Sequence, residues 1–120
     1  MPISEAEIET IILGHETRNE ALRQTLATRG LDLGEPRTIE CHFWAWSQDD
    51  ASALAEALAA SGFRILVQRP AGSPKDPSLW NIEAAIRQSI QLTMRREFTD
   101  ELVRAAAARS ARYDGWGTSL

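Results

Sequence analysis

The side chains best suited to chemistry stand next to one another near the middle of the chain, as Glu40, Cys41 and His42. A thiol beside an imidazole is the pair that a cysteine nucleophile or a metal site uses. Both kinds of site need the two side chains on one side, whereas neighbouring residues of a strand point to opposite faces. The sequence holds no second cysteine, and His15 is its only other histidine. We therefore predict a buried cysteine, no catalytic residue, no metal site and no cofactor.

Glu40 and His42 are two residues apart, so in a strand they share one face with Trp44 and, further on, Trp46. Together with Asp114 near the C-terminus, they can form a polar cluster. A carboxylate and an imidazole act as an acid–base pair in a pocket that adjusts their pKa values, and no pattern in the sequence indicates such a pocket. Tryptophan, in contrast, concentrates binding energy at protein interfaces. The predicted partner-binding surface consists of Glu40, His42, Trp44, Trp46, Asp114 and Trp116.

Two other interpretations of these residues stay open. Aromatic side chains on a sheet can stack on RNA bases, which makes a direct RNA-binding module an alternative function. An enzyme of unknown substrate is the other alternative, and it would require a pocket with perturbed acids. The arginines in the second half of the chain can also form a basic face for an acidic partner segment. That face would consist of Arg87, Arg95, Arg96, Arg104, Arg109 and Arg112.

The length of 120 residues predicts one domain, and the net charge of −4 argues against general nucleic-acid binding, which needs a dominant basic surface. No apolar run is long enough to span a bilayer. The first residues lack the basic start and apolar centre of a signal peptide. A single cysteine agrees with a reducing compartment. The expected location is therefore the cytoplasm, with no membrane partner.

A capping box opens the sequence, with Ser4 as the cap and Glu7 three residues on. Apolar residues then recur at helical spacing until Gly30, which is a good helix end. A polar stretch weakens the middle and allows two helices with a joint near residues 14–17. We expect this N-terminal helical segment, residues 1–30, to cover the tryptophan-bearing face of the sheet that follows.

Residues 37–47 alternate between two faces that both carry apolar side chains, which predicts a strand. An alanine-rich helix capped by Ser47 or Asp49 comes next, and a second strand follows it. Residues 80–94 fit both a period of two and a helical period. Because the period-two fit is longer, we expect one long strand there, with a bulge near Gln88.

A helix capped by Thr99 or Asp100 and a final strand at 113–118 complete the pattern. The order of elements is a helix followed by βαββαβ. This order predicts an α+β fold, namely a ferredoxin-like sandwich with two helices packed on one face of an antiparallel sheet. We expect one domain over residues 1–120, with the ferredoxin-like core at 36–118 and the helical extension before it.

Trp116 stands between Gly115 and Gly117, close to the C-terminus. A frayed tail would leave this large aromatic in water, so we expect a strand that pairs with 37–47 and holds Trp116 in the sheet. At a period of two, Tyr113 and both glycines share one face and Trp116 lies on the other. Trp116 then lies beside the polar cluster or in the helix-covered core. Glycine in a strand also permits a bulge or a close backbone approach.

Two stretches resemble the RraB family of ribonuclease E inhibitor proteins, "TIECHF" at 38–43 and "YDGWGT" at 113–118. The elements between them follow the order found in that family, and the resemblance covers roughly residues 19–118. It implies the ferredoxin-like fold and supports a strand over residues 80–94. It also implies a function in regulating RNA degradation, in which the protein binds ribonuclease E and damps its activity without chemistry of its own.

We therefore predict a non-catalytic regulatory protein that binds a protein partner, and the resemblance implies that the partner is ribonuclease E. Direct binding to nucleic acid is not expected, and a homodimer is compatible with the sequence. The RNA-binding module and the enzyme remain the alternatives.

Overall fold

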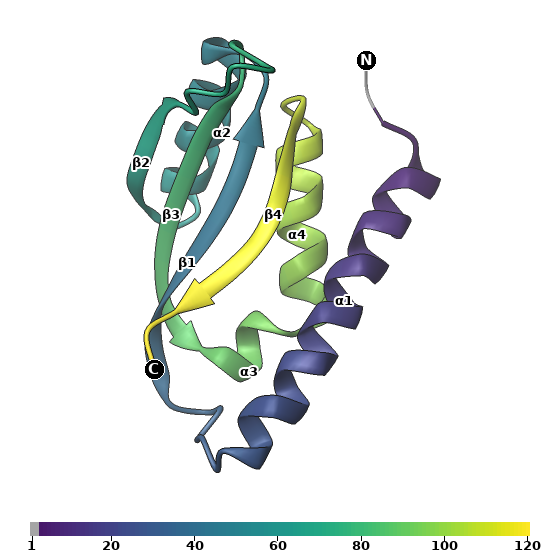
Figure 1. Ribbon diagram of the computed structural model, residues 1–120, viewed down its shortest axis with the longest axis vertical. Helices are drawn as coiled ribbons and strands as arrows, with labels where there is room; N and C mark the ends of the chain where they lie inside the picture. The colour runs from purple at the N-terminus through teal and green to yellow at the C-terminus, as the bar shows by residue number, and fades with distance from the viewer. Residues whose placement is uncertain (1–2) are drawn as a thin grey trace.

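The computed structural model describes residues 3–120, which form a curved sheet with helices packed against it (Figure 1). A long N-terminal helix lies beside the rest of the fold, two helices connect strands, and one helix is a single turn. In chain order the elements are α1 (Glu5–Thr28), β1 (Pro36–Ala45), α2 (Gln48–Ala60), β2 (Arg64–Pro70), β3 (Trp80–Ser89), α3 (Ile90–Thr93), α4 (Arg96–Ala107) and β4 (Ala111–Thr118).

The sheet has the strand order β2-β3-β1-β4, and every neighbouring pair is antiparallel. In the central pair, Phe43 of β1 lies opposite Ile82 of β3, and His42 lies opposite Glu83. Residues directly opposite each other in antiparallel strands point to the same face. The alternation along β1 therefore sets which side chains of the neighbouring strands face the helices. These pairings confirm an α+β fold with a four-stranded antiparallel sheet.

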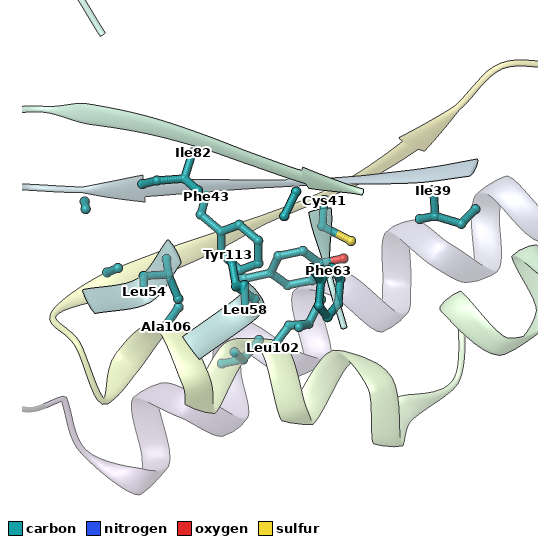
Figure 2. Packing of buried hydrophobic residues seen from close by; sticks show 14 of the residues in the cluster. Ile39, Cys41, Phe43, Leu54, Leu58, Phe63, Ile82, Leu102, Ala106 and Tyr113 are labelled. Carbon is teal, nitrogen blue, oxygen red and sulfur yellow. The ribbon is translucent and has the colours of Figure 1, made fainter. Parts of the chain in front are cut away.

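The apolar side of β1 forms the centre of the core. Ile39, Cys41 and Phe43 alternate along the strand and are each 0% exposed. Figure 2 shows Phe43 and Tyr113 of β4 under the sheet, next to Leu58 of α2. The two rings lie with their centroids 5.2 Å apart. The strand predicted from the alternation, and the buried cysteine within it, are thus confirmed.

One continuous helix forms α1, without the joint that the sequence allowed near residues 14–17. Ser4 Oγ accepts a hydrogen bond from Glu7 N at 3.1 Å, which confirms the predicted cap. The polar residues in the middle do not interrupt the helix because His15 and Asn19, four residues apart, lie on one helix face. Both turn towards the sheet and find hydrogen-bond partners there.

α1 packs beside α4 and β4 on the helix-covered side, so the expectation that it covers the tryptophan-bearing face was wrong. The buried polar residues of α1 hydrogen-bond to the backbone carbonyl of Tyr113 and to the indole of Trp116. The side chains of both β4 residues face the helices. Arg96 and Arg104 of α4 add ion pairs with α1 glutamates. The edge strand and α4 supply partners for the polar residues of α1. Within residues 3–120, the opposite face of the sheet therefore carries no helix.

β3 ends at Ser89, so the strand predicted over 80–94 was wrong in its last five residues. Ser89 Oγ accepts a hydrogen bond at 3.0 Å from the backbone N–H three residues on and caps α3. Ile90 and Met94 fit both periods and are buried in the helical arrangement. The N-cap, a local hydrogen bond, favours the helix where periodicity is ambiguous.

The next helix, α4, begins at Arg96 and not at the predicted caps Thr99 or Asp100. Thr99 lies within α4, and its side chain is buried in the core, with 1% exposed. The pairing of β1 with β3 is regular along its length, and the bulge expected near Gln88 does not occur there.

The register of β4 against β1 shifts between His42 and Phe43, which marks a β-bulge in β4. Gly115 lies at this bulge with a φ of +114°, a backbone conformation that residues with a side chain rarely adopt. Because of the bulge, Tyr113 and Trp116 both face the helices, although strict alternation placed them on opposite faces. Trp116 is held in the sheet as predicted, on its helix-covered side.

Candidate functional site

Glu40, His42 and Trp44 project from β1 on the open face of the sheet, the face away from the helices. His42 Nδ1 lies 3.1 Å from Glu83 Oε1 on the opposite residue of β3, and both side chains are half-buried. Trp44 is also half-buried, whereas Trp46, just beyond the end of β1, is 44% exposed. Three of the six predicted residues thus share one face, with Trp46 at the end of their strand.

Two glycines of β4 stand beside this polar pair. Gly117 lies opposite Glu40, and Gly115 lies opposite His42. A Cβ added to Gly117 would approach His42 Nε2 to 4.0 Å, an ordinary contact distance. Because neither glycine has a side chain, no side chain of these two β4 residues covers the His42 imidazole.

Four arginines surround the polar centre on the same face. Arg112 of β4 lies opposite Trp44, and Arg87 lies further along β3. Arg64 and Arg69 of β2 pair with β3 residues of the open face, which places them there as well. All four are exposed, and none forms an ion pair within residues 3–120. The open face is therefore basic around its edges, although the whole chain is acidic.

The six arginines that could form a basic face do not share a single surface. Of those six, Arg87 and Arg112 lie on the open face. Arg96 and Arg104 pair with glutamates of α1 on the other side of the sheet. Sequence reasoning missed the two arginines of β2, because β2 contains a register shift against β3 that alternation alone does not reveal.

Asp114 and Trp116 lie away from the open face, where β4 meets α1. Trp116 Nε1 donates to Asn19 Oδ1 at 3.0 Å, and Asn19 is 7% exposed. Asp114 is exposed and lines a cavity of about 130 Å³ together with His15 and Trp116. The structure thus divides the six predicted residues between two regions, and Trp116 belongs to the region that fastens α1 to the sheet.

His15 is a buried member of this α1–β4 junction. Arg18 Nη2 donates to His15 Nδ1 at 2.8 Å, so the ring proton is on Nε2, which donates to the Tyr113 carbonyl oxygen at 3.1 Å. The imidazole also stacks on the Tyr113 ring, with centroids 4.7 Å apart. Burial, and then the positive charge of Arg18, lower the pKa of His15 below its ordinary value. A neutral histidine fits both hydrogen bonds, so its role here is structural.

Cys41 points towards the helices, whereas the adjacent His42 points to the open face. Burial raises the pKa of the Cys41 thiol to about 12, so the thiol stays protonated at neutral pH and is a poor nucleophile. The Tyr113 hydroxyl lies next to this sulfur (Figure 2) and has no hydrogen-bond partner of good geometry among the described residues. A thiol is a weak acceptor, so the contact mainly fills space in the core.

Across residues 3–120, no three histidine, cysteine, aspartate or glutamate side chains come together in a group that could hold a metal ion. Over the same span, none of the helices combines the length and the apolar character needed to cross a membrane. What the described residues do assemble is the open face, which offers aromatic, polar and basic side chains to solvent.

The fold and this face define an α+β protein with an uncovered sheet surface suited to binding. The chain belongs to the RraB family, described as "Regulator of ribonuclease activity B", whose family model it matches over residues 16–118. The match begins within α1 and ends with β4, and it confirms the family resemblance found in the sequence. The comparison with curated proteins finds no match.

Proposed function

We propose that this chain is a non-catalytic regulator that inhibits a ribonuclease by binding to it, and that the partner is ribonuclease E. Membership of a family described as regulators of ribonuclease activity supports the regulatory role. The observation that carries the binding role is the open face, where half-buried Trp44 lies opposite Arg112, which forms no ion pair within residues 3–120, and where exposed Trp46 follows just beyond the end of the strand. Tryptophan and arginine are enriched among the residues that dominate protein interfaces.

A ferredoxin-like arrangement of one domain is part of the same proposal. Two strand–helix–strand units, β1–α2–β2 and β3–α4–β4, support it, because they interleave to give the antiparallel order β2-β3-β1-β4. In such an arrangement two helices cover one face and leave the other free for a ligand. The proposal also keeps the location expected from the sequence, the cytoplasm.

The contact residues in this proposal are Glu40, His42, Trp44 and Trp46. Trp116 supports the binding face from behind, through its hydrogen bond to α1. Glu40 and the His42–Glu83 pair supply acceptors and a donor, while the tryptophans supply apolar area.

The direct test is a binding and cleavage experiment with ribonuclease E from the same organism. Isothermal titration calorimetry measures complex formation, and a fluorescent RNA substrate measures cleavage. We expect saturable binding, with a cleavage rate that falls in step with the fraction of enzyme bound. Absence of binding at tens of micromolar protein would rule out this partner.

Substitutions locate the contact surface. Trp44→Ala and Trp46→Ala should each weaken binding by about tenfold, as expected for aromatic anchors of an interface. Leu92→Ala is the matched control, because Leu92 is 40% exposed on α3, outside the open face. Equal affinities for all three variants and the parent protein would place the binding surface elsewhere.

The RNA-binding alternative is separated by a gel shift of RNA with the regulator alone, repeated over a range of salt concentrations. A shift that weakens steeply as salt rises would support direct RNA binding through phosphate contacts. We expect no shift at moderate salt, because the chain is acidic overall.

A further inference from the structure

We propose that the β2–β3 half of the open face binds an acidic polypeptide segment of the partner, with carboxylates held by Arg64 and Arg87. This inference rests on the proposed function, since it gives the chemistry of the segment that meets the same face. The two arginines stand at one end of the sheet, where β2 begins and β3 approaches its end. Arg69 continues the basic edge along β2.

A shallow cavity lies between the two arginines. Arg64 is opposite Ala85, and Arg87 is opposite Thr38 of β1, so all four side chains are on the open face. Ala85 is 4% exposed and forms part of the floor, while Arg64 and Arg87 are exposed at the rim. The cavity has a volume of about 260 Å³ and is lined by Thr38, Gly62, Arg64, Ala85, Ile86 and Arg87.

Charge complementarity gives the class of ligand. Neither Arg64 nor Arg87 has an acidic partner within residues 3–120, whereas Arg96 and Arg104 on the other side of the sheet each have two. The guanidinium group presents several N–H donors in a planar fork that matches a carboxylate. Two such forks at the rim of one cavity can hold two carboxylates of an extended segment.

The surface between the arginines favours a polypeptide over RNA. Val67 and Ala85 give this half small apolar side chains, which suit the aliphatic groups of a peptide. No residue of β2 or β3 on the open face is aromatic, although binding of single-stranded RNA relies on bases stacked on aromatic rings. The nearest strand tryptophan, Trp44, lies opposite Asn81, outside the cavity between Arg64 and Arg87, so no aromatic ring lines that cavity.

The test is fluorescence anisotropy with a labelled twelve-residue peptide that repeats aspartate, leucine, glutamate and serine. We expect the full chain to bind it at low salt, and the double variant Arg64→Gln/Arg87→Gln to bind about tenfold more weakly, as for the loss of close charge pairs. The matched control is Arg29→Gln/Arg95→Gln, which removes the same charge from two exposed arginines outside the open face. That control should change the affinity by less than about twofold, since only the long-range field changes.

Several outcomes would overturn the inference. Equal weakening in both double variants would show a general charge effect without a site. Tighter binding of a twelve-nucleotide oligouridylate, lost in the Arg64→Gln/Arg87→Gln variant, would show that the arginines bind RNA instead. Self-association that depends on the same arginines, without peptide binding, would assign the face to a second copy of the chain.

The peptide assay contains no ribonuclease, so it fails or succeeds independently of the proposed function. Peptide binding without inhibition of ribonuclease E would contradict the proposed function and leave the acidic-segment site intact. Inhibition of ribonuclease E by the Arg64→Gln/Arg87→Gln variant at the parent level would overturn this inference alone. Because both arginines are exposed, circular dichroism should show the same fold for the variant and the parent protein.

Discussion

On the helix-covered side of the sheet, two arginines of α4 and two buried polar residues of α1 find partners within the chain. Arg96 and Arg104 of α4 pair with glutamates of α1, and His15 and Asn19 of α1 hydrogen-bond to β4. On the open side, the four arginines of the strands have no such partner in the described part of the chain. Arginine therefore serves packing on one side of the sheet and remains available for a partner on the other.

The first prediction tests the two sides on adjacent residues of β1. Phe43→Ala should lower the free energy of unfolding by about 3–5 kcal/mol, because Phe43 is fully buried against Tyr113. His42→Ala should change it by less than about 1 kcal/mol, since the His42–Glu83 pair is half exposed to water. Urea denaturation followed by circular dichroism measures both values. A similar loss in the two variants would mean that the open face contributes to stability as the core does.

The second prediction concerns the two glycines of β4, which differ in backbone conformation. Gly115→Ala should cost about 1–3 kcal/mol, because Gly115 has a φ of +114° at the bulge. Gly117→Ala is the control, with no positive φ and only a 4.0 Å approach to His42 Nε2, and should change stability by less than about 1 kcal/mol. The same urea titration decides between them. Equal stabilities of the two variants would show that the bulge does not need glycine.

The sequence predicted those parts of the fold that depend on local patterns. The alternation along β1, the Ser4 and Ser47 caps and the place of the last strand all follow from neighbouring residues, and the structure confirms them. Local information fails at residues 90–94, because the apolar spacing fits two periods and a single serine cap decides.

The candidate site was predictable only in part, because its composition depends on register. Glu40, His42 and Trp44 share a face by simple alternation along one strand. A bulge in β4 moves Trp116 to the helix side, and a register shift in β2 brings both of its arginines, Arg64 and Arg69, to the open face. Such shifts are decided by pairing between strands far apart in sequence, and a single strand's pattern does not contain them.

The third prediction uses pH to compare the α1–β4 junction with the rest of the molecule. Burial and Arg18 lower the pKa of His15 in the folded state, so in acid the unfolded chain binds a proton that the folded chain does not. The contribution of His15 to the free energy of unfolding should therefore be fully present above the unfolded pKa of about 6.5. It should be lost progressively as the pH drops below that value. The groups facing His15 are Arg18, Arg112 and Asp114, besides Tyr113.

The measurement for this prediction is the free energy of unfolding between pH 7.5 and pH 5.5, for the parent protein and for His15→Gln. Glutamine keeps an N–H donor for the Tyr113 carbonyl and has no titrating group. We expect a lower stability overall for His15→Gln, but a flatter dependence on pH than in the parent protein. Parallel pH profiles would show that another group causes the acid sensitivity.

The fourth prediction has the smallest expected effect and returns to the arginines. Arg96→Gln/Arg104→Gln removes ion pairs between α4 and α1, so its urea midpoint should lie slightly below that of the parent protein at low salt. The difference should shrink as salt screens these exposed charges. Arg64→Gln/Arg87→Gln removes no ion pair within residues 3–120, so its midpoint should lie closer to that of the parent protein. A midpoint lowered as much by the open-face variant as by the helix-side variant would remove the distinction between the two sets of arginines.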